Sequence, residues 1–171
     1  MKLPPYQNFP ELISDTLILR KIVKDDIESL VEISFYNALP ALTVEDAAEM
    51  QERINLDYQN GSSIHWGIAD KKSNKIMGTV GYYRGFKNRS GEIGCVLKPE
   101  FQGKGLMTEA MKLALEFGIN EMKLREIGAI TSGENKPAIQ LLKRLSFVKI
   151  RDLDDDEVEY VFVKITDHRN W

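Results

Sequence analysis

The chain has few of the residues that would build a disulfide framework, a metal site or a nucleic-acid surface. It contains one cysteine, Cys95, and two histidines, His65 and His168, which lie far apart in the sequence. A single cysteine excludes an internal disulfide, and the absence of a Cys/His/Asp cluster leads us to expect no metal. The formal net charge of −3 gives no basic field, so no nucleic-acid partner is expected.

Long apolar runs are also missing. No stretch of the sequence approaches the roughly 20 apolar residues that a membrane span requires, and we expect no membrane partner. The first residues, which include Pro4 and Pro5, form no continuous apolar core of the kind found in signal peptides. Hydrophobic residues make up 43% and charged residues 29%, which is a globular composition. We therefore expect one domain over residues 1–171 and a cytoplasmic location.

The hydrophobic periodicity predicts an α/β chain with short strands and amphipathic helices. Residues 1–15 are expected to form an extended lead-in. Two capping-box patterns, Asp25 with Glu28 and Thr43 with Asp46, predict the starts of the first two helices. The predicted strands are 16–22, 64–70, 76–83, 91–97, 127–131, 147–153 and 157–165, and the predicted helices are 25–37, 43–58, 107–120 and one that Asn135 caps.

The most informative segment is a loop with two closely spaced glycines between a predicted strand and a predicted helix. Gly103 and Gly105 let the backbone approach a bulky anion, because neither carries a Cβ atom. The free N–H groups of a helix N-terminus favour phosphate. A Walker A loop would need Ser or Thr after Lys104, and a Rossmann fingerprint would need glycine at Thr108. The loop therefore predicts a phosphate-bearing ligand of another class, with a plain flexible turn as the alternative.

Residues 102–107 resemble the Gln/Arg-x-x-Gly-x-Gly/Ala signature of the GNAT acyl-CoA-dependent N-acetyltransferases, with Met107 in place of the small last residue. The similarity is closest to the RimJ/RimL-like branch, the ribosomal-protein N-terminal acetyltransferases. It covers nearly the whole chain, through residues 16–20, 66–69, 91–94, 103–110, Asn135, 141–142 and Phe147.

The resemblance implies a GNAT fold, a single α/β (α+β) domain with a mixed, strongly twisted sheet. About six to seven strands and about four helices are expected. In this family two central strands splay apart at a bulge, and acetyl-CoA lies in the split. Gly94 would permit that bulge and free nearby N–H groups for an oxyanion.

The implied reaction transfers acetyl from acetyl-CoA, the expected cosubstrate, to a primary amine. A neutral amine attacks the thioester directly in a ternary complex, and no metal is required. The acceptor would be a protein N-terminus, ribosomal in the RimJ/RimL-like branch, or a small amine. A noncatalytic acyl-CoA-binding or sensing protein with the same fold is the alternative. A homodimer is a possible assembly for such a protein.

Carried onto this sequence, the resemblance places the cofactor on the glycine loop, the strand before it and the last helix. Asn135 matches a family asparagine that contacts the pantetheine arm, although a simple N-cap role explains it equally well. Cys95 is expected to be core rather than a nucleophile. The predicted cofactor-binding residues are Cys95, Val96, Leu97, Gln102, Gly103, Lys104, Gly105, Leu106, Met107, Thr108 and Asn135.

Glu92 is the candidate general base, because it begins the strand that leads into the glycine loop and matches a strand glutamate with this role in relatives. A solvated or salt-bridged carboxylate is the alternative. Tyr82 and Tyr83 are candidate acceptor-binding residues, with packing as the alternative. The general acid of the family is missing, because Leu142 and Ala138 stand where relatives carry tyrosine or serine. A thiolate can leave without being protonated near neutral pH, so the reaction does not require this acid.

Overall fold

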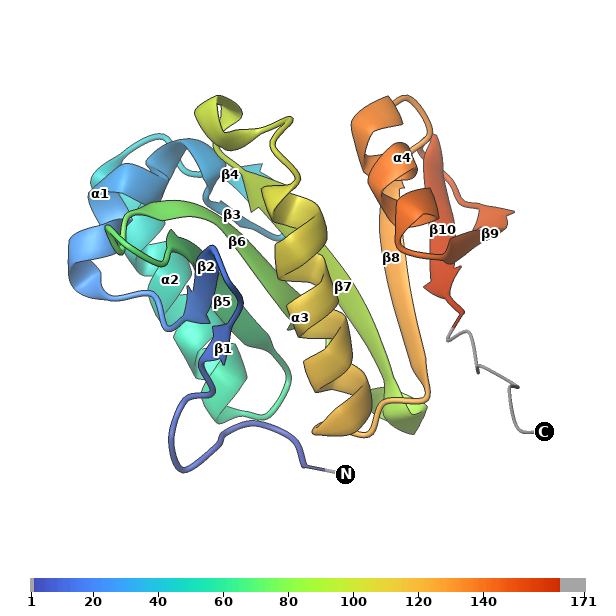
Figure 1. Ribbon diagram of the computed structural model, residues 1–171, viewed down its shortest axis with the longest axis horizontal. Helices are drawn as coiled ribbons and strands as arrows, with labels where there is room; N and C mark the ends of the chain where they lie inside the picture. Colours follow the sequence, from blue (N-terminus) through green and yellow to red (C-terminus); the bar gives the residue numbers. More distant parts are fainter. Residues whose placement is uncertain (1, 164–171) are drawn as a thin grey trace.

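The computed structural model describes residues 2–163, in which eight strands form one sheet in the order β1-β2-β5-β6-β7-β8-β10-β9 (Figure 1). A separate hairpin pairs β3 with β4. In the main sheet β7 and β8 are parallel and their neighbours are antiparallel, so the sheet is mixed, as predicted. The strands are β1 (Leu12–Ile13), β2 (Leu17–Arg20), β3 (Phe35–Tyr36), β4 (Leu39–Pro40), β5 (Ile64–Asp70), β6 (Ile76–Tyr83), β7 (Ser90–Leu97), β8 (Glu126–Ser132), β9 (Phe147–Asp152) and β10 (Glu157–Phe162), and the helices are α1 (Ile27–Leu30), α2 (Val44–Gln59), α3 (Leu106–Asn120) and α4 (Lys136–Arg144).

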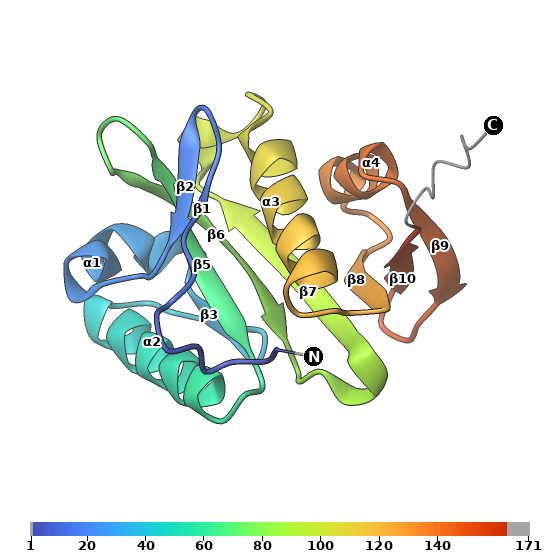
Figure 2. The same ribbon diagram turned by 60° about the horizontal axis from the view of Figure 1, so that its bottom comes forward.

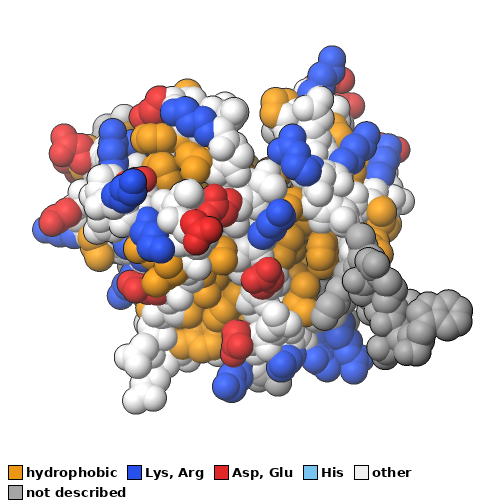
Figure 3. Space-filling view, in the orientation of Figure 1, with side chains coloured by type: hydrophobic (Ala, Val, Ile, Leu, Met, Phe, Trp, Pro, Cys, Tyr) orange, Lys and Arg blue, Asp and Glu red, His pale blue; other side chains and the backbone are white. Residues whose placement is uncertain are grey.

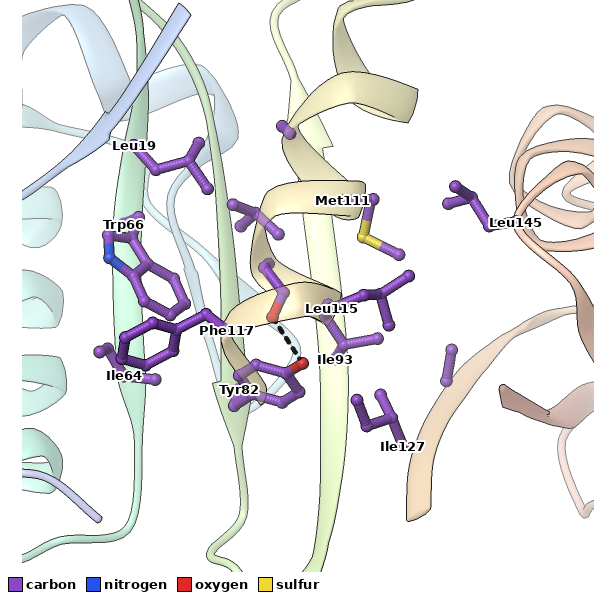
Figure 4. Packing of buried hydrophobic residues seen from close by; sticks show 14 of the residues in the cluster. Leu19, Ile64, Trp66, Tyr82, Ile93, Met111, Leu115, Phe117, Ile127 and Leu145 are labelled. Atoms are coloured by element: carbon purple, nitrogen blue, oxygen red, sulfur yellow. Dashed lines mark hydrogen bonds between the residues drawn. The ribbon is translucent and has the colours of Figure 1, made fainter. Parts of the chain in front are cut away.

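Helices cover both faces of this sheet (Figures 1 and 2). The alternation of side chains along each strand produces two cores, one on each face. On the face of α3 and α4 the core is large, and it contains Trp66 and Tyr82, both fully buried (Figure 4). The smaller core under α1 and α2 includes Leu30 and Ala47. Trp66 also fixes the N-terminal segment, because its Nε1 donates a hydrogen bond of 2.8 Å to the carbonyl oxygen of Pro10.

The central feature is a split between β7 and β8. Only Ser90, Gly91 and Glu92 of β7 pair with β8, after which the two strands diverge (Figure 1). β7 stays paired with β6 as far as Leu97 without a shift in register, so the predicted bulge at Gly94 is wrong. The split comes from the divergence of two parallel strands. Gly94 instead makes room for the ring of Tyr83, since a Cβ there would lie 3.1 Å from Cε2 of that ring.

The two predicted helix starts had different outcomes. The capping box of α2 is confirmed: Thr43 Oγ1 accepts the N–H of Asp46 at 3.1 Å, and the Asp46 carboxylate accepts the N–H of Thr43 at 3.0 Å. The box at Asp25 is wrong, because Asp26 accepts the N–H of Val23 at 2.9 Å and also binds Arg20 of β2.

The predicted helix at 25–37 is also too long. α1 ends at Leu30, and a short 3-10 turn (Val31–Ile33) follows it. The chain then turns at Asn37 and Ala38, whose φ angles are 50° and 63°, and this turn produces the unpredicted β3–β4 hairpin.

The remaining differences lie at the edges. The lead-in contributes β1, so the main sheet has one or two strands more than the six to seven predicted. α3 begins at Leu106, one residue earlier than predicted. The last strand is confirmed as far as Phe162, while residues 164–165 of that prediction and His168 lie outside the described residues.

Candidate active site

A cleft of about 490 Å³ opens between the N-terminal end of α3, helix α4 and the diverging end of β7, and it appears as a notch beside α4 in Figure 3. All the predicted cofactor residues except Lys104 line it. The Nζ atom of Lys104 lies instead 5.7 Å from the ring centre of Phe101. The lining consists of Cys95, Val96, Leu97, Gln102, Gly103, Gly105, Leu106, Met107, Thr108, Asn135, Pro137, Ala138, Gln140, Leu141 and Arg144.

The glycine loop has the backbone geometry that glycine permits. Gly103 and Gly105 have φ angles of 73° and 78°, and a Cβ atom built on either would meet no atom within 4 Å. Gly105 is the N-cap of α3, and no side chain caps this end of the helix. The first-turn carboxylate of Glu109 accepts a 2.8 Å hydrogen bond from Thr16 Oγ1 and ties α3 to the sheet. The N–H groups of the first turn are thus left without a side-chain partner beside an open cleft, which suits an anion.

The open edge of β7 supplies further N–H groups. The N–H of Lys98 donates to the carbonyl of Met77 at 2.9 Å, which fixes the hydrogen-bonding phase of the β6–β7 ladder. In an antiparallel ladder that phase alternates, so the N–H groups of Cys95 and Leu97 point away from β6. They point toward the side from which β8 has diverged. The carbonyl of Leu97 lies on the same edge and accepts a hydrogen bond of 3.1 Å from Gln102 Nε2.

A second cavity of about 220 Å³, which we call the acceptor cavity, lies on the opposite face of the sheet, under α1 and α2. Cys95 and Val96 line both this cavity and the cleft, so the two spaces approach each other at this point of β7. The described residues that line the acceptor cavity are Ile22, Leu30, Ile33, Ser34, Phe35, Ala47, Met50, Gln51, Ile54, His65, Thr79, Tyr83, Gly94, Cys95 and Val96.

The two tyrosines that were predicted to bind the acceptor lie on opposite faces of the sheet. Tyr83 lines the acceptor cavity. Tyr82 does not, because its side chain is fully buried under α3, where its hydroxyl donates to the carbonyl oxygen of Ala114 at 2.9 Å (Figure 4). The prediction for Tyr82 is wrong, since consecutive side chains of a strand point to opposite faces of the sheet.

Glu92 lies near both spaces but lines neither. Its carboxylate is on the same face of β7 as Gly94 and Val96, which line the acceptor cavity. The Oε1 atom of Glu92 is 2.5 Å from Nη1 of Arg84, and its side chain is 28% exposed. The predicted base is therefore an ion-paired, partly exposed carboxylate at the side of the cavity.

Burial keeps the titratable groups of the acceptor cavity uncharged near neutral pH. It lowers the pKa of His65 to about 4 and raises the pKa of the Cys95 thiol to about 12. The pKa of Tyr83 is also raised, mainly by burial and further by its proximity to Cys95. A thiol with so high a pKa is a poor nucleophile, which agrees with the expectation that Cys95 is a core residue.

Helix α4 contributes cleft residues that the sequence analysis missed. Arg144 is the clearest, since its Nη1 donates a hydrogen bond of 3.1 Å to Thr108 Oγ1 on α3. It shares a helical face with Pro137, Gln140 and Leu141, at the spacing i, i+3, i+4 and i+7. This spacing is readable in the sequence and is the signal that could have identified Arg144.

The family positions on α4 can also be located. Asn135 Oδ1 accepts the N–H of Ala138 at 3.2 Å, so the N-cap role of Asn135 is confirmed. Ala138 lines the cleft, whereas Leu142 is buried in the core. Neither position supplies a hydroxyl group for protonating a leaving sulfur.

Within residues 2–163, no three or more His, Cys, Asp or Glu side chains are grouped so that they can hold a metal ion. The helices in this part of the chain are all too short or too polar to cross a membrane.

Comparison with known proteins assigns the family. The model of the acetyltransferase (GNAT) domain matches residues 16–148. The uncharacterized N-acetyltransferase YoaA of Bacillus subtilis (strain 168) is 30% identical over 149 residues, which are 82% of this chain and 84% of that protein. The ribosomal protein uS5-alanine N-acetyltransferase of Escherichia coli (strain K12) is 29% identical over 98 residues, which are 56% of this chain and 50% of that protein.

A solved structure of spermidine N-acetyltransferase from Vibrio cholerae has the same fold, with a TM-score of 0.73 at 20% sequence identity. The match covers 88% of this chain and 95% of that chain. The split sheet, the glycine loop before α3 and the family match over most of the sequence lead to one conclusion: the chain belongs to the GNAT family and is an acetyltransferase.

Proposed function

We propose that this protein transfers the acetyl group of acetyl-CoA to a primary amine by direct attack in a ternary complex. The single observation that carries the proposal is that Cys95 and Val96 line both the cleft and the acceptor cavity. Two reactants that enter from opposite faces of the sheet would meet at this point. Holding both in place would make the reaction effectively unimolecular, which is a large part of the rate gain in such reactions.

The cleft has the groups that acetyl-CoA requires. The backbone N–H groups from Gly103 to Thr108 would hold its pyrophosphate at the positive end of α3. Arg144 adds a cation on the opposite wall. Asn135 and the open edge of β7 would contact the pantetheine arm and the thioester.

The chemistry follows from the same arrangement. The amine nitrogen bonds to the thioester carbon, and the N–H groups of Cys95 and Leu97 would stabilise the oxyanion that forms. The amine loses its proton to Glu92, directly or through water, while the C–S bond breaks and CoA leaves as a thiolate. Solvent protonates that thiolate, so no acid from Ala138 or Leu142 is needed.

Two acceptor classes are candidates. One is a protein N-terminus, which the uS5-alanine acetyltransferase modifies. The other is a small amine, of the kind that gives the spermidine acetyltransferase of the same fold its name. A homodimer remains our prediction for the assembly. A noncatalytic acyl-CoA-binding role is the second candidate function, and the missing hydroxyl groups at Ala138 and Leu142 favour it.

Release of free thiol from acetyl-CoA, measured against a panel of peptides and small amines, tests the proposal. Thiol release that depends on an amine supports transfer. CoA binding without any such release in the whole panel would support the noncatalytic role. A thermal-shift comparison of acetyl-CoA, NAD and ATP checks the donor, because a ligand at 100 times its Kd adds about 2.7 kcal/mol of stability. A response to NAD or ATP alone would contradict the proposal.

A further inference from the structure

The acceptor cavity is built from uncharged groups. Among the described residues, no Asp, Glu, Lys or Arg side chain lines it. Its walls are mostly aliphatic, with Leu30 from α1, Met50 from α2 and Ile22 from the segment that follows β2. The polar members are all neutral side chains, and they are Ser34, Gln51, His65, Thr79 and Tyr83.

At the floor of the cavity, the rings of His65 and Tyr83 each pack against a glycine. Gly81 pairs with His65 on one side and with Gly94 on the other, so the three form a row across β5, β6 and β7. A Cβ on Gly81 would lie 3.2 Å from Cδ2 of His65, and one on Gly94 would lie 3.1 Å from Cε2 of Tyr83. The rings of His65 and Tyr83 lie 5.7 Å apart between their centres. The floor is thus a fixed surface that carries no charge near neutral pH.

Three carboxylates on segments that border the cavity have partners of their own. Glu92 pairs with Arg84 at 2.5 Å. Glu32 lies 3.9 Å from the buried Lys98. On α2, Asp57 accepts a 3.1 Å hydrogen bond from the hydroxyl of Tyr36. None of the described residues that line the cavity carries a carboxylate that could compensate a second cation inside it.

We propose that the acceptor is a primary amine whose body is apolar and uncharged, and that the cavity discriminates against diamines and polyamines. This inference rests on the proposed function, since it assigns the substrate class of the same site. The reacting nitrogen can lose its proton to Glu92, but a second ammonium further along the chain would be desolvated without a counter-charge. A monoamine of the same length places only methylene groups there and gains from their burial.

Gln51 is the position that determines this selectivity. It lines the acceptor cavity and also a smaller neighbouring cavity of about 100 Å³, and His65 and Ile54 likewise border both. Gln51 therefore lies at the end of the acceptor cavity toward which the body of an extended amine would point. Its Nε2 donates to Asn55 Oδ1 at 3.1 Å, on the same helix. A carboxylate at position 51 would supply the counter-charge that the cavity lacks.

The test compares hexylamine with 1,6-diaminohexane, which differ only by the second amino group. We expect kcat/KM for hexylamine to be at least about tenfold higher, which corresponds to about 1.4 kcal/mol. In Gln51→Glu the preference should shrink or reverse. Gln51→Met, which removes the amide without adding charge, should keep it, as should Asn60→Asp, the same chemical change at an exposed position after α2. Equal or better use of the diamine by the unsubstituted protein would overturn the proposal.

The affinities of hexylamine and 1,6-diaminohexane can also be compared directly, by equilibrium binding to protein saturated with CoA. This second readout separates the two claims, because a protein without turnover fails the proposed reaction and still reports which amine its cavity binds. Tighter binding of hexylamine supports the uncharged-acceptor assignment. Tighter or equal binding of the diamine contradicts it, whatever the turnover.

Discussion

Arg84 holds the carboxylate of Glu92 through Nη1 and Oε1 at a distance of 2.5 Å, near the start of the strand whose far end borders both the cleft and the acceptor cavity. Glu92 pairs across the sheet with Tyr83, which lines the acceptor cavity. The proposed base is therefore next to the acceptor but ion-paired. Since the guanidinium side chain is 70% exposed, the pair itself adds little to stability.

Substitution of Glu92 tests its role as the base. We expect Glu92→Gln to lower kcat by about 10²- to 10⁴-fold, with the largest loss below neutral pH, where more of the acceptor is protonated. CoA affinity should stay the same, because Glu92 does not line the cleft. Arg84→Met is the matched control: it breaks the same ion pair and should leave turnover largely intact. Equal losses in the two variants, or no loss in Glu92→Gln at any pH, would remove Glu92 from the base role.

The glycine loop is tested by a pair of variants with the same backbone strain. Gly105 and Gly85 have φ angles of 78° and 84°, and neither would bring a Cβ within 4 Å of another atom. Gly105→Val and Gly85→Val should each lose roughly 1–2 kcal/mol of stability, since β-branched residues disfavour this conformation.

Only the Gly105 variant should also lose CoA affinity, by at least about tenfold, because its side chain would stand where the backbone must approach the pyrophosphate. Calorimetric titration with CoA separates the two effects. Similar CoA affinities in the two variants would place the ligand elsewhere.

Arg144 should contribute to cofactor binding through its charge. Arg144→Gln is expected to weaken CoA by about threefold to tenfold and to reduce the salt dependence of binding, because one phosphate contact is lost. Lys143→Gln, the neighbouring cation, does not line the cleft and should leave the affinity unchanged. An effect of equal size in both variants would indicate a general field rather than a specific contact.

His65 should make stability depend on pH. Burial lowers its pKa from the ordinary 6.5 to about 4, so between these values the unfolded chain binds a proton that the folded chain does not. Stability should therefore fall as the pH falls from about 6.5 toward 4, by about 2 to 3 kcal/mol. Urea unfolding at pH 7.5 and 4.5 measures this loss, and His65→Phe should reduce it by that amount. The same pH dependence in both proteins would contradict a histidine that stays neutral in the folded chain.

The sequence could group most of the residues that line the cleft, because this grouping depends on local backbone chemistry. Two glycines before a helix, an asparagine at a helix start and a strand leading into the loop are all readable from neighbouring residues. Gly103, Gly105 and Asn135, which were predicted to bind the cofactor, line one cleft. Lys104 does not line it, because the direction of a long loop side chain depends on contacts such as that with Phe101.

Most residues that line the acceptor cavity could not be predicted from the sequence, because the cavity depends on long-range packing. The acceptor cavity forms where α1 and α2 cross the far face of the sheet, and residues such as Leu30, Met50 and His65 carry no sequence motif. The strand split was expected for the wrong reason, since it comes from β8 leaving β7 rather than from a bulge at Gly94. The first helix was predicted too long because its apolar periodicity continues almost to the hairpin turn. Neither residue of that turn, Asn37 or Ala38, is a glycine or proline that would have marked the end of the helix.

The central claim is that acetyl-CoA binds at the N-terminus of α3 and reacts with an amine at Cys95 and Val96. Calorimetric titration of the folded protein with CoA tests it most directly, with Gly105→Val as the comparison. We predict one CoA bound per chain and a clear loss of affinity in the variant. No detectable association of CoA with protein whose folding is verified would contradict the claim.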